Sequence, residues 1–175
     1  VLKVDAGVSS QYLSALMMIA PKMKEGLELR WEGPAVSMPY LYLTANLMRR
    51  LGFKVFVLGN EIRIPFQQLE KPLASQAVEP DWSAASYWFS AAALANKAEI
   101  YLPGFKEYSL QGDSIVAQHM APLGIEQIFI GGGIRIKKAT PFDHARAINL
   151  IDCPDLAQTL VPAYAALGRH QSFLG

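Results

Sequence analysis

The sequence predicts an α/β fold built from a repeated unit of the order β-α-β-α-β-β. Segments with the two-residue alternation of strands take turns with segments of helical periodicity. Leu51-Gly52 recurs as Leu123-Gly124, and Ile62-Arg63-Ile64 recurs as Ile134-Arg135-Ile136, both at a spacing of 72 residues. Two matches in one register favour an internal duplication over coincidence.

The first copy is expected to hold a strand, a helix, a strand, a helix and a strand hairpin. Ser9 or Ser10 can cap the first helix, and Pro39 suits the first turn of the second helix. Gly59-Asn60 is typical of a hairpin turn. The expected ranges are Leu2–Val4, Ser9–Ala20, Leu27–Trp31, Pro39–Leu51, Lys54–Leu58 and Ile62–Ile64.

The second copy repeats this order, and a third copy begins after it. Its expected strands and helices are Gln76–Val78, Ser83–Ala95, Glu99–Leu102, Asp113–Leu123, Gln127–Ile130 and Ile134–Ile136. The third copy should start with a strand at Ala147–Ile151 and continue with a helix from Pro154 to Leu167, for which the sequence offers no evident packing partner. Because the chain begins without Met and stops within this third copy, we expect it to be an internal piece of a longer protein.

The overall composition is that of a folded, nearly neutral protein. Hydrophobic residues make up 51% of the chain and charged residues 18%, with a net charge of +1. Lys and Arg are spread along the chain, without the basic stripe of a nucleic-acid-binding protein. The apolar run Tyr12–Ala20 is too short to span a bilayer, and His119, His144 and His170 lack the spacing of a metal site. The single cysteine, Cys153, fits a cytoplasmic protein without disulfides, and we expect no cofactor.

Two segments place hydroxyl groups at expected helix starts. Asp5–Gln11 runs from a strand into a helix through Ser9 and Ser10, and Val36–Tyr40 places Ser37 before a second helix. The free N–H groups and the dipole of a helix N-terminus favour an anion, and hydroxyls add neutral donors for a phosphate or a polyol. The alternative for both segments is that the serines only cap their helices.

Two further segments place carboxylates at helix starts. In Glu79–Tyr87, Asp81 or Ser83 can cap a helix, and a hinge is a second interpretation. In Asp152-Cys153-Pro154-Asp155, Asp152 is the expected N-cap, and Asp155 lies near the third helical position. Asp155 could stabilise the helix terminus, or it could act as a general base or bind sugar hydroxyls. Cys153 is expected to be a small buried residue.

Together, five blocks of the sequence resemble the 5-enolpyruvylshikimate-3-phosphate (EPSP) synthase family. They match the family's Ser-Ser-Gln motif, its Ser-x-Pro-Tyr helix, its domain-crossover helix, its Ser-x-Gln-Gly-Asp turn and the helix that bears its catalytic aspartate. The blocks occur in the family's order. They are DAGVSSQYLSALMMIAP, VSMPYLYLTANLMRRLG, VEPDWSAASYWFSAAALA, EYSLQGD and IDCPDLAQTLVPAYAAL.

The resemblance implies the enolpyruvyl transferase fold, with two halves that each contain three copies of the unit. Residues 1–78 would then be the last unit of one half, and residues 79–175 the first unit and part of the next unit of the other half. Members of the family transfer the enolpyruvyl group of phosphoenolpyruvate to the 5-hydroxyl of shikimate 3-phosphate and release phosphate. We expect the parent protein to be a monomer and this chain, taken alone, to be inactive.

The resemblance also assigns roles to individual residues. Asp155 would bind the ring hydroxyls of shikimate 3-phosphate and act as the catalytic base. Gln11 would lie between shikimate 3-phosphate and phosphoenolpyruvate. The residues expected to contact or border shikimate 3-phosphate alone are Ser9, Ser10, Ser37 and Tyr40. The sequence departs from common forms of the family at Met38 and Pro80, where Lys and Gly are frequent.

Two other interpretations stay open at this point. One is a relative of UDP-N-acetylglucosamine enolpyruvyl transferase, which shares the repeated unit. Ser9-Ser10-Gln11 followed by Ser37-x-Pro39-Tyr40 argues against it, because that pattern suits a phosphate-bearing sugar acid. The other is a phosphosugar-binding module without catalysis. The true length of the parent protein would distinguish an enzyme of two domains from such a module.

Overall fold

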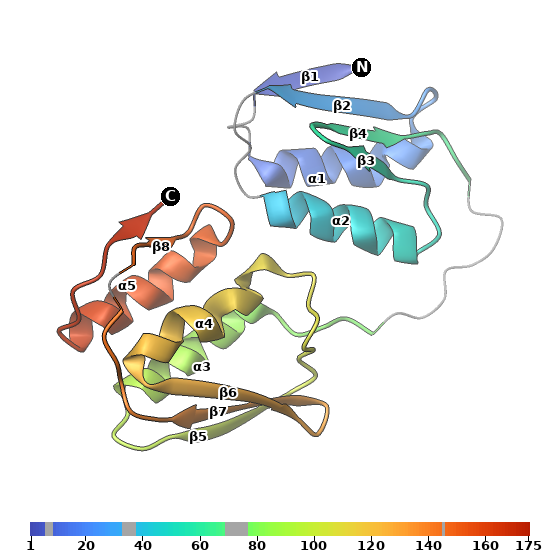
Figure 1. Cartoon of the computed structure of the whole chain (residues 1–175). Helices are drawn as coiled ribbons and strands as arrows, with labels where there is room; N and C mark the ends of the chain where they lie inside the picture. Colours follow the sequence, from blue (N-terminus) through green and yellow to red (C-terminus); the bar gives the residue numbers. More distant parts are fainter. Residues whose placement is uncertain (6–8, 33–37, 69–76, 145) are drawn as a thin grey trace. The chain divides into compact units, whose positions relative to one another are not determined.

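The computed structural model describes residues 1–5, 9–32, 38–68, 77–144 and 146–175. They form two compact units, which we call unit 1 (Val1–Ala77) and unit 2 (Val78–Gly175). Each unit has a hydrophobic core of its own, and each combines helices with a sheet (Figure 1). The α/β fold predicted from the sequence is therefore confirmed.

Unit 1 is a four-stranded sheet covered on one face by two helices (Figure 1). The strand order is β1-β2-β4-β3, with β1 and β2 parallel and the other neighbours antiparallel. The elements are β1 (Leu2–Asp5), α1 (Ser10–Ile19), η1 (Ala20–Lys22), β2 (Leu27–Glu32), α2 (Met38–Arg50), β3 (Phe56–Leu58) and β4 (Glu61–Ile64).

The core of unit 1 follows from the spacing of its apolar residues. Helix α1 buries Leu13 and Met17, four residues apart, so both lie on the face toward the sheet. In β4 the buried residues are Ile62 and Ile64, two residues apart, as the alternation of a strand requires. Helix α2 ends before Gly52, whose φ of 92° lies in the left-handed region that favours glycine.

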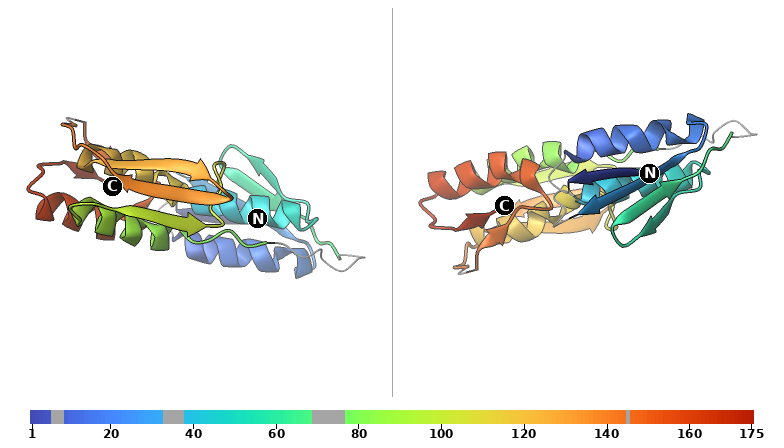
Figure 2. Two further views of the ribbon diagram at one scale, coloured as in Figure 1. Left: turned by 90° about the horizontal axis from the view of Figure 1, so that it is seen from below. Right: turned by 90° about the horizontal axis from the view of Figure 1, so that it is seen from above.

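Unit 2 places helices α3 and α4 on one face of a three-stranded sheet, whose strands lie side by side when seen from below (Figure 2). Its elements up to the sheet are α3 (Trp82–Leu94), β5 (Glu99–Pro103), η2 (Gly112–Ile115), α4 (Val116–Met120), η3 (Ala121–Leu123), β6 (Ile125–Ile130) and β7 (Gly133–Lys138). After the sheet come β8 (Ile148–Asn149), η4 (Pro154–Leu156), α5 (Ala157–Ala166) and β9 (Phe173–Leu174).

The predicted duplication is visible in the strand pairing. The order β5-β7-β6 in unit 2 repeats the order β2-β4-β3 in unit 1. Val57 pairs with Ile62 in the first hairpin, and Phe129 pairs with Ile134 in the second, so both partners recur after 72 residues. Gly124, which follows η3 with a φ of 78°, takes the place that Gly52 has after α2. The two copies therefore share the arrangement of these three strands and the hairpin register.

The third copy is also present, and it corrects one expectation. Strands β8 and β9 precede and follow α5 in the chain and pair with each other in parallel. Strands β1 and β2 precede and follow α1 and pair in the same way. The sequence offered α5 no packing partner, but its buried residues Leu160, Ala163 and Tyr164 belong to the core of unit 2. They pack against α3, whose apolar residues are not confined to one face.

The strand predicted at Gln76–Val78 is a second correction. Gln76 lies outside the described residues, and Ala77 and Val78 belong to no strand. Val78 is 92% exposed, so this short segment buries no apolar face that would stabilise a strand. Pro80 follows two residues later, and it has no N–H to donate to a strand partner.

One half-buried cation, Lys138, joins the ends of two helical segments in unit 2. The ammonium group of Lys138 donates to the carbonyl of Ala93 near the end of α3 and to that of Leu123 at the end of η3, at 3.3 Å. Helix C-termini leave carbonyls without intrahelical donors, and a cation there also interacts favourably with the dipole. Burial lowers the pKa of Lys138, in keeping with its partly desolvated position.

We predict that Lys138→Met destabilises unit 2 by about 1.5–3 kcal/mol, because it leaves two carbonyls without their charged donor. Urea titration read by hydrogen exchange of peptides from unit 2 would measure the change. Lys137→Met is the matched control, since Lys137 is partly exposed and lies 3.6 Å from Glu99 in a surface ion pair. The control should cost at most about 1 kcal/mol. Equal losses for both variants would contradict the role given to Lys138.

Candidate active site

The start of α1 carries the first group of predicted site residues. Ser9 is the N-cap, and its hydroxyl oxygen accepts a hydrogen bond from the backbone N–H of Gln11 at 3.3 Å. Ser10 is 9% exposed and lies in the first turn, whereas Ser9 and Gln11 are exposed. A capping hydroxyl keeps its own proton, so Ser9 can still donate to a ligand. The capping interpretation and the binding interpretation are therefore compatible.

The starts of α1 and α2 lie at the same edge of the sheet, the one formed by the carboxyl ends of the parallel strands β1 and β2. Strands β1 and β2 are parallel and end level with each other, with Asp5 opposite Glu32. The chain leaves both strands at this edge and returns as α1 and α2, which lie side by side in Figure 1. Two helix N-termini therefore face one edge, which is a favourable place for an anion.

Tyr40 lies in the first turn of α2 and is half-buried. Its carbonyl accepts from the hydroxyl of Thr44 at 3.0 Å, and the same hydroxyl lies 3.1 Å from that of Ser14 on α1. This contact links α1 and α2 within their first two turns. Ser37, the other residue predicted here, lies outside the described residues.

Asp155 lies in unit 2, exposed in the first turn of η4, which continues into α5. The neighbouring residues anchor this turn, since Cys153 and Leu156 are buried in the core of unit 2. Asp155 therefore combines an accessible carboxylate with a fixed backbone, as a general base requires.

The N-cap expected before Asp155 was wrong. Cys153, not Asp152, occupies the N-cap position of η4, and no described side chain makes a capping hydrogen bond there. Pro154 takes the first helical position, so Asp155 lies at the second helical position and not near the third. Cys153 is buried in the core. The helix therefore begins one residue later than it would with Asp152 as its N-cap.

Cys153 is a structural residue, as predicted. Burial, together with the nearby carboxylates of Asp113 and Asp152, raises the pKa of its thiol to about 11. A thiol with this pKa is neutral at physiological pH and is a poor nucleophile. Asp113, 2% exposed, lies close enough to exert this effect although 40 residues separate it from Cys153 in the chain.

The entrance to α3 contains a network of hydrogen bonds that the sequence did not reveal. Asp81 caps the helix by accepting from the N–H of Ser83 at 2.8 Å, one of the two caps considered. Glu79 accepts from the indole N–H of Trp82 at 3.0 Å and from the hydroxyl of Ser109 at 2.9 Å. Gln111 accepts from the N–H of Trp82 at 2.9 Å. The Ser-x-Gln-Gly-Asp turn therefore holds the beginning of α3.

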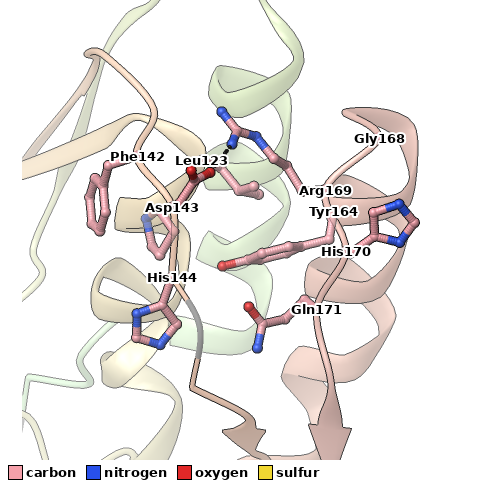
Figure 3. A pocket seen from close by; sticks show the side chains of 10 residues that line it. Leu123, Phe142, Asp143, His144, Tyr164, Gly168, Arg169, His170 and Gln171 are labelled. Carbon is pink, nitrogen blue, oxygen red and sulfur yellow. Dashed lines mark hydrogen bonds and ion pairs between the residues drawn. The ribbon is translucent and has the colours of Figure 1, made fainter.

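A pocket of about 340 Å³ lies at the other end of α5 from Asp155 (Figure 3). Tyr164 extends toward it from α5, and Arg169 forms an ion pair with Asp143 at 2.8 Å. Of the predicted site residues that are described, none lines this pocket. Because the charges of Arg169 and Asp143 compensate each other, the pocket offers no evident site for an anion.

Neither a metal-ligand cluster nor a membrane-spanning helix is present in the described ranges. These ranges contain no group of three or more His, Cys, Asp or Glu side chains arranged to hold a metal ion. They also contain no helix that is both long enough and apolar enough to cross a membrane.

Comparison with known proteins identifies the family. A family model for EPSP synthase (3-phosphoshikimate 1-carboxyvinyltransferase) matches residues 1–170. The chain belongs to the EPSP synthase family. This confirms the resemblance predicted from the five sequence blocks.

Individual relatives agree with this assignment. The 3-phosphoshikimate 1-carboxyvinyltransferase of Bacteroides fragilis (strain ATCC 25285) is 41% identical over 175 residues, which are 99% of this chain and 42% of the relative. The enzyme of the same name from Dehalococcoides mccartyi (strain ATCC BAA-2266) is 35% identical over 179 residues, 99% of this chain and 40% of the relative. The chain thus spans about two fifths of the length of these EPSP synthases.

Solved structures support the fold. Two structures of EPSP synthase from Acinetobacter baumannii match 98% of this chain and 40% of their own, with TM-scores of 0.57 and 0.60. Their sequence identities are 18% and 17%, so this likeness concerns the fold alone.

We predict that Cys153 is protected from thiol reagents until unit 2 unfolds. With a pKa of about 11 instead of the ordinary 9.0, the folded chain holds about a hundredfold less thiolate at pH 8 than the unfolded chain. Labelling with a chromogenic disulfide at pH 8, with and without urea, would measure both rates. Fast labelling of the folded chain would contradict this.

The same pKa shift predicts a pH dependence of stability. The folded-state pKa is raised above the unfolded value, so the contribution of Cys153 is fully present below pH 9.0 and is lost as the pH rises toward 11. Cys153→Ala should remove this part of the alkaline destabilisation.

Proposed function

We propose that this chain is a segment of an enzyme that transfers the enolpyruvyl group of phosphoenolpyruvate to the 5-hydroxyl of shikimate 3-phosphate, with release of phosphate. Family membership over residues 1–170 is the observation that carries the proposal. The relatives described above bear the name of this activity and are similar over nearly the whole chain. The same comparisons favour this activity over a UDP-N-acetylglucosamine enolpyruvyl transferase and over a binding module.

Unit 1 would supply groups that bind the phosphate of shikimate 3-phosphate. Ser9 is the N-cap of α1, and Ser10 lies in its first turn. At this end of the helix, the dipole and the free N–H groups favour an anion. Ser37 would add a third hydroxyl, Tyr40 would border the sugar, and Gln11 would lie between the two substrates. The level ends of β1 and β2 support this assignment, because they bring both helix starts to one edge.

Unit 2 would supply the general base. The exposed carboxylate of Asp155 can accept hydrogen bonds from two ring hydroxyls at once. As the 5-hydroxyl attacks phosphoenolpyruvate, Asp155 would take up its proton. The buried neighbours of Asp155 support this role, because they hold the turn in place while leaving the carboxylate accessible.

The activity is tested in the full-length protein, by which we mean a protein that contains this chain and matches the relatives over their whole length. Phosphate release should require both shikimate 3-phosphate and phosphoenolpyruvate. The 175-residue chain alone should release none, because it spans only 42% of the Bacteroides fragilis relative. A full-length protein that folds but releases no phosphate would overturn the proposed function. That the full-length protein is a cytoplasmic monomer stays a prediction.

We predict that Asp155→Ala in the full-length protein lowers kcat by about 10²–10⁴-fold, the usual contribution of a general base. Its melting temperature should change little, because Asp155 is exposed. Asp152→Ala is the matched control, since Asp152 is also exposed and lies three residues away. Near wild-type turnover by Asp155→Ala would leave this residue as a helix-stabilising carboxylate only.

We predict that Ser9→Asp weakens the binding of shikimate 3-phosphate while the protein stays folded. Aspartate caps a helix about as well as serine, so the melting temperature should be retained. Its negative charge would repel the phosphate, and calorimetry should show affinity lower by about tenfold or more, which corresponds to about 1.4 kcal/mol. If affinity were unchanged, Ser9 would act only as a cap. Asp81→Ser at the start of α3 is a control for the exchange of capping residues.

A further inference from the structure

A pair of buried hydroxyl groups joins the helix that carries Asp155 to α3. The hydroxyl of Thr159 on α5 donates to that of Ser86 on α3 at 3.0 Å, and Ser86 donates to the carbonyl of Ser83 at 2.6 Å. Ser90 adds a third contact by donating to the carbonyl of Thr159 at 3.2 Å. Thr159 is 3% exposed and Ser86 is fully buried. Ser86 and Ser90 each donate their single proton to a backbone carbonyl, whereas the single proton of Thr159 has two acceptors within reach, the oxygen of Ser86 and the carbonyl of Leu156.

The hydroxyl pair adds a directional constraint to the apolar contacts between the two helices. Apolar side chains tolerate small shifts of one helix along another, because the contacts are not directional. Hydrogen bonds weaken steeply when their geometry is lost. Sliding or rotation of α5 against α3 would break the bonds from Thr159 to Ser86 and from Ser90 to Thr159, although Thr159 and Ser86 would each keep a carbonyl acceptor in their own helix. The two bonds between the helices therefore favour one register.

The register between α5 and α3 matters for Asp155 because Thr159 lies one helical turn after it. Thr159 follows Asp155 by four residues, and its hydroxyl also lies 3.1 Å from the carbonyl of Leu156, within the turn that carries Asp155. No described side chain caps η4. Buried Cys153 and Leu156 anchor this turn, and Thr159 adds a polar contact to it from one turn later.

The constraint extends from α3 into the rest of unit 2. Ser83, whose carbonyl accepts from Ser86, donates its own hydroxyl to the buried carboxylate of Asp113. Asp113 belongs to η2, and the Ser-x-Gln-Gly-Asp turn that contains it also holds the entrance of α3 through Gln111. The hydroxyl pair therefore connects the Asp155 turn to a network that is fixed at several points.

We propose that Ser86 and Thr159 are positioning residues for catalysis, whose hydroxyl pair sets the place of the Asp155 carboxylate relative to the reacting hydroxyl. The inference rests on the proposed function, in which Asp155 is the base. Neither residue touches the substrate in this proposal. Both act through the backbone of η4 and the first turn of α5.

The test is Thr159→Val in the full-length protein, a change that keeps the shape of the side chain and removes its hydroxyl. A displacement of about 1 Å can cost about a hundredfold in rate, so kcat per folded protein should fall between about tenfold and a hundredfold. KM for phosphoenolpyruvate should stay near that of the unsubstituted protein. Thr159→Ser restores the hydroxyl and should restore most of kcat.

Two further variants separate positioning from general stability. Tyr164→Phe is the matched control on the same helix, because it removes a buried hydroxyl that donates to the carbonyl of His119 at 2.9 Å, away from Asp155. It should lower the melting temperature and leave kcat unchanged. If Thr159→Val does not fold, Ser86→Ala with Thr159→Val removes both hydroxyls and leaves neither unpaired. This double variant should fold and show the same loss of kcat.

The outcomes distinguish the two proposals. If Thr159→Val or the double variant turns over like the unsubstituted protein while Asp155→Ala is impaired, the positioning role is wrong and the base stands. Equal losses of kcat in Thr159→Val and Tyr164→Phe would also overturn positioning, because both would then report stability. If Asp155→Ala keeps full turnover, the base assignment fails and the positioning role fails with it.

Discussion

Burial of α3 is the constraint on which the rest of unit 2 depends. Mean apolarity is high along this helix, and its buried residues include Trp82, Phe89 and Ala93, so it must be covered on several sides. The sheet, α4 and α5 provide this cover. A helix in such surroundings cannot leave polar side chains without partners. The serines of α3 therefore determine where hydroxyl, carbonyl and carboxylate groups of the neighbouring segments must lie, including those beside Asp155.

The same constraint gives the Ser-x-Gln-Gly-Asp turn a structural explanation. Trp82 begins α3 fully buried, with its ring 4.8 Å from that of Phe105, and its indole N–H requires an acceptor. Glu79 provides that acceptor, and Ser109 and Gln111 from the turn complete the arrangement. The turn therefore holds the chain at the point where it enters unit 2.

Local features of the fold could be predicted from the sequence because their causes are local. The N-caps Ser9 and Asp81 and the left-handed Gly52 each depend on a few neighbouring residues. The 72-residue spacing predicted the shared hairpin register for a similar reason, since a duplicated pattern of alternation produces a duplicated pairing. The fold class followed from these elements and their order.

Features that depend on distant partners could not be predicted. Val78 has the residue type of a strand but no partner strand, and Asp152 has the residue type of a cap but follows a chain path set by buried Cys153. The bond between Ser86 and Thr159 spans 73 residues, and no spacing rule connects them. The candidate site divides in the same way: its residue types were recognisable, whereas the groups that fix their positions were not.

Two arginines in the described part of unit 1 are already engaged in other contacts. Arg30, on β2, is held by Glu28 at 2.6 Å and by Glu61 at 2.9 Å, so its charge is already compensated. Arg49, near the end of α2, donates to the carbonyl of Val55 at 2.8 Å, at the opposite end of that helix from Tyr40. In the proposed function, a phosphate at the starts of α1 and α2 would meet neutral donors and helix dipoles equivalent to about half a charge each. A dianionic phosphate is bound most strongly by charge-assisted bonds from Arg or Lys. Hydroxyls and helix termini can therefore orient such a ligand, but strong binding requires cations in addition to these groups.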